Sequence, residues 1–232
     1  MFHSQLPEPV RIPPDNDNFR WEYPIRSVEV VQVAKAVRMV SGIRAALTLA
    51  DQGFTTESAT LLRTVSDFAA EIIFLSEGLT STFVKAHHEF VDQYFAPLPA
   101  TPDELASRDR ESYVGRKDIL TAHRRFFGSA GDGLLKTAAY LNKNYDSYVH
   151  GAYFTAMELY HGGTRSFMLA GDESPHHRCV AKVAVAGKLH EVISALELMA
   201  LTLNLTELRE SIREGRIALD ASDEQSTYLP GL

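Results

Sequence analysis

The chain has 232 residues, a length that one ordinary domain reaches, and its 45% hydrophobic and 23% charged residues are typical of a globular protein and exclude a disordered tail. Its formal charge of -7 excludes a general DNA-coating role, because the field of the whole molecule repels a polyanion. The single cysteine, Cys179, excludes an intrachain disulfide and a zinc site built from several cysteines, and it favours a cytoplasmic location.

The first 24 residues contain prolines and turn-forming residues at close intervals, which a regular helix does not accommodate. We therefore predict that residues 1–24 form an extended or partly disordered arm. Three aromatic residues, Phe19, Trp21 and Tyr23, are suited to fix the end of this arm to the rest of the protein or to a second subunit. The prolines also interrupt any apolar segment of the kind that a secretion signal needs, so no export signal is expected.

The next part of the chain has the spacing of helices that bury one face. Apolar residues recur at three- and four-residue steps over residues 25–52, and Gly53 then offers a stop. The same spacing predicts a second, central helix over residues 55–78 and a third over residues 83–95. Charged residues interrupt the apolar stretches well before the roughly 18 residues that a membrane span requires, so no membrane contact is expected.

Helical spacing continues through the second half of the chain. Further helices are predicted over residues 102–108, 117–127, 134–144, 147–160, 176–205 and 207–219, followed by a loose tail over residues 220–232. The glycine-rich residues 128–133 are predicted to end one helix. Asn144, Tyr145 and Asp146 are predicted to separate two helices or to break a single one.

Strands and repeats are nearly absent from the pattern, and this settles the predicted fold class. Thr164–Ala170 is the one candidate strand, and no repeat of fixed period is present. We therefore predict an all-α fold, a helical bundle of about five main helices with short extra helices, formed as a single domain by residues 25–219.

One stretch gathers positive charge against the acidic background. Between Arg108 and Arg125 there are six basic residues and three acidic ones. Two interpretations stay open: a solvated helix face with mixed charges, and a patch that faces phosphate groups.

Polar groups of several kinds gather in the segment 141–151, LNKNYDSYVHG. Lys143 and His150 are seven residues apart, about two turns, so a continuous helix puts both on one face. A helix broken near Asp146 instead puts Lys143 at the end of one helix and His150 in the first turn of the next. Either geometry can bring a cation and an imidazole to one pocket.

This segment resembles the HEPN superfamily of bacterial helical domains, whose ribonuclease members carry an arginine, a polar residue and, after a short spacer, a histidine. Lys143 stands at the arginine position, Asn144 at the polar position and His150 at the histidine position. The resemblance implies metal-independent RNA cleavage, in which the histidine moves a proton and the cation stabilises charge on the phosphorane. Lys143 departs from the pattern, because a lysine is a mobile point charge whereas an arginine offers a planar fork to two phosphate oxygens.

A second feature lies on the predicted central helix, where Arg63, Asp67 and Glu71 follow at four-residue steps among apolar residues. An arginine followed by an acidic residue one turn later is also similar to helical relatives in the same group. The three residues form either a surface ion-pair ladder or a line that faces an internal cleft, where Arg63 would meet the His150 segment.

Three hypotheses of function follow. The first is a HEPN-like ribonuclease or toxin of a bacterial defence or toxin-antitoxin system, a homodimer whose site holds His150, Lys143, Asn144 and Arg63 and whose basic stretch holds RNA. The second is a catalytically silent helical interaction module that forms a homodimer or binds a protein partner. The third, a metal-containing oxidoreductase, rests on Glu158 and His161, but no second copy of that spacing exists. No metal and no cofactor are therefore expected.

Overall fold

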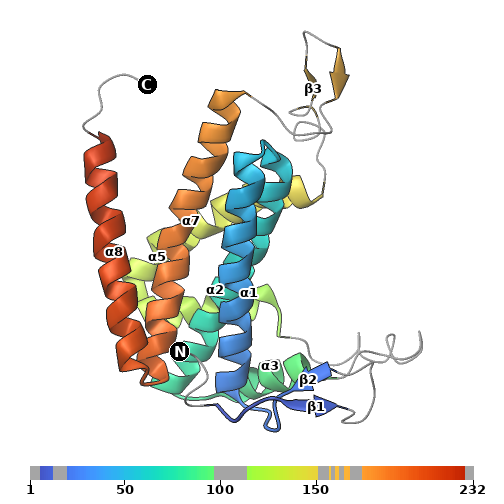
Figure 1. Ribbon diagram of the computed structural model, residues 1–232. Coiled ribbons are helices and arrows are strands. Elements are labelled where there is room, and N and C mark those ends of the chain that lie inside the picture. Colours follow the sequence, from blue (N-terminus) through green and yellow to red (C-terminus); the bar gives the residue numbers. More distant parts are fainter. Residues whose placement is uncertain are drawn as a thin grey trace.

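The chain forms an all-α helical bundle (Figure 1). This computed structural model describes residues 6–12, 20–96, 114–150, 157, 160–161, 165–167 and 174–227. The helices described are α1 (Val28–Asp51), α2 (Thr55–Thr80), α3 (Lys85–Phe95), α5 (Arg116–Val149), α7 (Pro175–Thr202) and α8 (Thr206–Thr227). All but α3 are long, which confirms the predicted bundle of about five main helices.

Four short strands accompany the helices. Strand β1 (Val10–Ile12) pairs antiparallel with β2 (Arg20–Glu22), and β3 (Tyr160–His161) pairs antiparallel with β4 (Ser166–Phe167). The first pair lies in the predicted N-terminal arm, at the same end of the bundle as α3 (Figure 1). Strand β4 falls within the one predicted strand.

Helix α2 is the centre of the bundle, as predicted. Helices α1, α5 and α7 all pack against it, and α8 packs on α7 at the outer edge (Figure 1). The main core joins one face each of α1, α2 and α7, and burial of each large apolar side chain stabilises the fold by about 1.5–3 kcal/mol. Its largest buried members are Met39, Ile43, Leu62, Val65, Ile72, Val185, Val192 and Met199.

Two glycines mark the contact and the connection between α1 and α2. A Cβ at Gly42 would lie 2.9 Å from Cγ2 of Val65, so the glycine lets the two helices approach closely. Gly53 has a φ of 82°, the left-handed conformation that commonly follows a helix end. The predicted stop at Gly53 is therefore confirmed, with α2 beginning two residues later at Thr55.

Helix α5 agrees with the prediction at its glycine-rich stretch and differs from it near its end. Gly128, with φ 57° and ψ -143°, is not helical and ends a first helical segment, as predicted, but the second segment begins directly after Gly128 rather than after residue 133. The predicted break at Asn144 to Asp146 is wrong, because α5 is helical to Val149 and the amide of His150 still donates to the carbonyl of Asp146 at 3.0 Å. A short polar side chain favours a turn by bonding its own backbone, whereas the carboxylate of Asp146 is bound by another helix.

The C-terminal helix also extends beyond its predicted limit. Helix α8 continues to Thr227, so the tail predicted to be loose from residue 220 is helical over its first eight residues. The predicted helix over residues 102–108 and most of the one over residues 147–160 lie outside the described residues.

Candidate functional site

Arg63 is the predicted site residue whose contacts the structure defines best. It lies in the middle of α2 with its side chain only 13% exposed, and its Nε donates to Oδ1 of Asp146 on α5 at 2.6 Å. Its guanidinium also pairs with Asp67, one turn later on α2. Arg63 therefore ties α5 to α2 at the level of the LNKNYDSYVHG segment.

Arg63 carries a positive charge, and two carboxylates already balance it. Burial opposes the charged form, yet hydrogen bonds and charge interactions with Asp67 and Asp146 outweigh it and raise the pKa of Arg63 above its usual value. The two aspartates remain partly exposed, at 45% and 41%. A guanidinium held by two carboxylates must release at least one of them before it binds a phosphate.

Lys143 lies near this contact on α5, and His150 directly follows the last residue of that helix. Both residues are exposed. With Asp146 they follow at three- and four-residue steps, so all three share one face near the end of α5. Arg63 thus meets the His150 segment through Asp146. The side chain of Asn144 lies outside the described part of the chain.

The line of Arg63, Asp67 and Glu71 contains the ion pair of the predicted ladder and also contacts two neighbouring helices. Arg63 and Asp67 form the ion pair of a ladder along α2. The two ends of the line reach neighbouring helices, because Arg63 binds Asp146 on α5 and Glu71 binds Nζ of Lys35 on α1 at 2.5 Å. The line therefore joins three helices and is not a purely solvated face.

Lys35 lies in a cage of aromatic rings that the sequence did not indicate. Its Nζ is 5.0–5.5 Å from the ring centroids of Phe68, Phe90 and Tyr94. Burial raises the pKa of Glu71 above its usual value, although the ammonium of Lys35 opposes this. Lys35 is buried and Glu71 is half-buried, and the two bind each other within the fold, so we assign the pair to the link between α1 and α2.

A second unpredicted cluster surrounds His87 at the start of α3. The imidazole is fully buried, and its Nε2 lies 3.0 Å from Oε2 of Glu77 on α2. Its Nδ1 accepts a hydrogen bond from the amide of Val84 at 3.0 Å, which assigns the proton of the neutral ring to Nε2. Phe74 stacks on the ring at a centroid distance of 4.3 Å.

A third cluster joins α2 to α7 by polar groups. Nζ of Lys188 lies 2.5 Å from both Oγ of Ser66 and Oε2 of Glu191. A serine beside a lysine is one arrangement that activates a nucleophile. Here the ammonium is neutralised by Glu191 and Ser66 is only 2% exposed, so a substrate does not reach the hydroxyl. The cluster is therefore a polar contact inside the bundle.

The basic stretch is only partly described. Arg116, Lys117, Arg124 and Arg125 are exposed on the first part of α5. Nη2 of Arg125 lies 3.8 Å from Oε2 of Glu77, whereas Arg108 and Arg110 lie outside the described residues. Both predicted interpretations of the stretch stay open.

No family model, curated protein or solved structure matches the chain. The HEPN resemblance therefore rests on the residues alone. Within the described residues, no three histidine, cysteine or acidic side chains are grouped so that they would hold a metal ion. None of the helices in those residues combines the length and the apolar character that crossing a membrane requires.

Proposed function

We propose that the chain is a catalytically silent helical interaction module that forms a homodimer. The observation that carries this proposal is the state of Arg63, whose charge is matched by Asp67 and Asp146. The polar groups of the Lys35, His87 and Lys188 clusters are likewise bound between helices. Their common effect is to fix the packing of the bundle rather than to present reactive groups.

The outer face of α7 supports the dimer. Val180 and Val183 lie at helical spacing on that face and expose 55% and 66% of their surface. Gly187, one turn further, has no atom within 4 Å of the place where a Cβ would lie. Adjacent exposed apolar residues beside an open glycine suit the approach of another helix, and we assign this face to the second copy.

Replacing Val183 with aspartate should therefore separate the dimer into monomers, because a charge in a closed apolar contact is costly. We expect the dissociation constant to rise at least about tenfold, measured by sedimentation equilibrium of the full chain. The matched control is Val37→Asp, a valine on α1 that is 53% exposed and should leave the dimer intact. A monomeric parent chain, or a Val183→Asp variant that remains dimeric, would show that the proposed interface is wrong.

A HEPN-like, metal-independent ribonuclease or toxin is the second candidate, supported by the exposure of Lys143 and His150 on one face of α5. For such an enzyme His150→Ala should lower the rate of RNA cleavage in EDTA by about 100-fold or more, because a general acid or base contributes that much. The control is His88→Ala, an exposed histidine on α3. A chain that cleaves no RNA, or equal rates for His150→Ala and the parent, rules this candidate out.

A further inference from the structure

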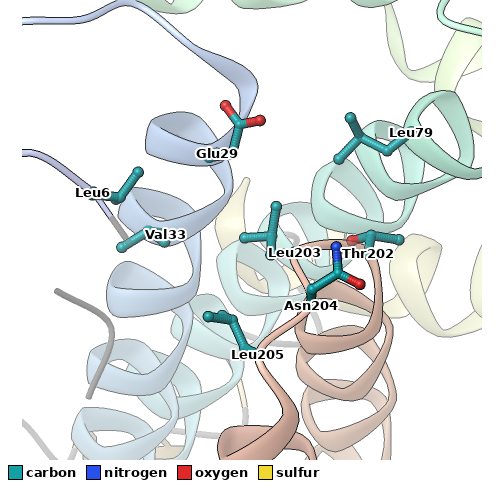
Figure 2. Close-up of a pocket in the computed structure, with 8 residues that line it drawn as sticks. All are labelled: Leu6, Glu29, Val33, Leu79, Thr202, Leu203, Asn204 and Leu205. Atoms are coloured by element: carbon teal, nitrogen blue, oxygen red, sulfur yellow. The ribbon is translucent and has the colours of Figure 1, made fainter. Parts of the chain in front are cut away.

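A small pocket lies at the end of the bundle where α1 begins and where α2 and α7 end (Figure 2). Its volume is about 210 Å³. The apolar part of its wall comes from the N-terminal arm, from α1 and α2 and from the turn between α7 and α8, as Leu6, Val33, Leu79, Leu203 and Leu205. This space accepts a short aliphatic chain and is too small for a nucleotide.

Among the described residues of the wall, the charged group is the carboxylate of Glu29. The carboxylate of Glu29, in the first turn of α1, is at the rim, and Asn204 adds a neutral side-chain amide that can both donate and accept (Figure 2). Among the described residues, the side chain of Glu29 makes no hydrogen bond or ion pair. Of the described residues that line the pocket, none is a lysine, an arginine or a histidine.

The ends of two helices add to this potential. Leu79 lies in the last turn of α2 and Thr202 is the last residue of α7, so the carbonyl ends of both helices are at the pocket. Neither helix carries a basic residue in its last turn. The C-terminal end of a helix carries a partial negative charge that favours a nearby cation. The starts of α1 and α8, also at the pocket, carry partial positive charge, so the full charge of Glu29 decides the sign of the potential.

We propose that this pocket binds an aliphatic ammonium group carried on a short apolar chain. The ammonium is placed at Glu29 and the helix ends, and the carbon chain contacts the leucines. An anion is repelled by Glu29, and a neutral ligand gains no charge-assisted contact with this half-buried carboxylate. The ammonium belongs to a free small amine or to a lysine side chain of a partner protein, and both present the same chemistry.

The test titrates the full ¹⁵N-labelled chain with n-butylammonium chloride and, separately, with n-butanol, which has the same carbon chain without the charge. We expect saturable shifts of the Leu203, Asn204 and Leu205 amide signals with n-butylammonium, and binding of n-butanol at least about tenfold weaker. A blocked lysine, N-acetyl-lysine amide, is the third probe. Equal binding of blocked lysine and n-butylammonium identifies a partner's side chain as the source, and binding of n-butylammonium alone identifies a free amine.

Variants connect the binding to Glu29. Glu29→Gln keeps the shape and should weaken n-butylammonium binding at least about tenfold, because it removes the charged partner of the ammonium. The matched control is Glu57→Gln, which removes an exposed carboxylate from the first turn of α2. Leu79→Lys supplies an ammonium from the chain itself and should abolish binding while the far-ultraviolet circular dichroism stays unchanged. Equal binding of n-butanol and n-butylammonium, no shift at residues 203–205, or unchanged binding by Glu29→Gln would overturn the proposal.

Discussion

Replacing His87 with alanine should lower the free energy of unfolding by about 3–5 kcal/mol at pH 7.5, the largest effect expected of any single substitution considered. The imidazole is fully buried and stacks on Phe74, so its removal leaves a cavity between α2 and α3. It also removes the partner, 3.0 Å away, of the Glu77 carboxylate, which is itself only 7% exposed. Glu77 keeps Ser81 and Arg125 as partners but loses its hydrogen bond to the buried imidazole, and this loss adds to the cost of the cavity.

Urea unfolding of the full chain, followed by circular dichroism, measures this effect. The matched control is His88→Ala, the next residue on α3, whose side chain is exposed and should change the stability by no more than about 0.5 kcal/mol. A loss below about 1 kcal/mol for His87→Ala would contradict the view that this cluster holds α3 on the bundle.

The loss of unfolding free energy caused by His87→Ala should be smaller at acidic pH. Burial lowers the pKa of His87 below its usual value, although the carboxylate of Glu77 opposes this. As the pH falls through about 6.5, the unfolded chain therefore takes up a proton at His87 before the folded chain does, and the parent loses up to about 1.4 kcal/mol per pH unit. Since the variant lacks this group, the difference between the two proteins should shrink from pH 7.5 to 5.5. A difference that stays constant would contradict a neutral buried imidazole.

The helices could be predicted because their signal is local. Apolar residues at three- and four-residue steps define α1 and α2, and Gly53 between them has the conformation that favours glycine. The prediction of a break in α5 is wrong because the deciding contact is not local. The preference of Asp146 for a turn is overcome by Arg63, which is 83 residues away in sequence and whose position no local pattern reveals.

The polar clusters show the same limit. Lys35 meets Glu71 across 36 residues, and Lys188 meets Ser66 across 122. In the sequence these are charged or polar residues within apolar helices, which suggests a buried partner but does not identify it. For Arg63 the sequence left a surface ladder and an internal cleft open. The structure shows the ion pair of the ladder and a contact of Arg63 with Asp146 in the His150 segment, where Lys143 and His150 are exposed.

The contact of Arg63 provides the second large expected effect. Arg63→Met keeps most of the apolar side-chain length but removes the charge, and it should lower the free energy of unfolding by about 2 kcal/mol, because Asp67 and Asp146 then lose their shared cation and repel each other. The loss is smaller than for a fully buried pair, since both carboxylates are partly exposed to solvent. Arg44→Met, which removes an exposed arginine from α1, is the control and should cost less than about 0.5 kcal/mol.

A double-mutant cycle separates a structural Arg63 from a functional one. If Arg63 acts through Asp146, the combined variant Arg63→Met/Asp146→Ala should be more stable than the sum of the two single losses predicts, with a coupling of about 1 kcal/mol.

A structural role also requires that Arg63→Met change stability while dimer formation and any RNA cleavage, measured well below the unfolding transition, stay as in the parent. If the losses of stability in the two single variants were strictly additive, the contact between Arg63 and Asp146 would not stabilise the fold. Selective loss of cleavage at unchanged stability would favour the ribonuclease over the silent module, because Arg63 would then act on a substrate rather than on α5.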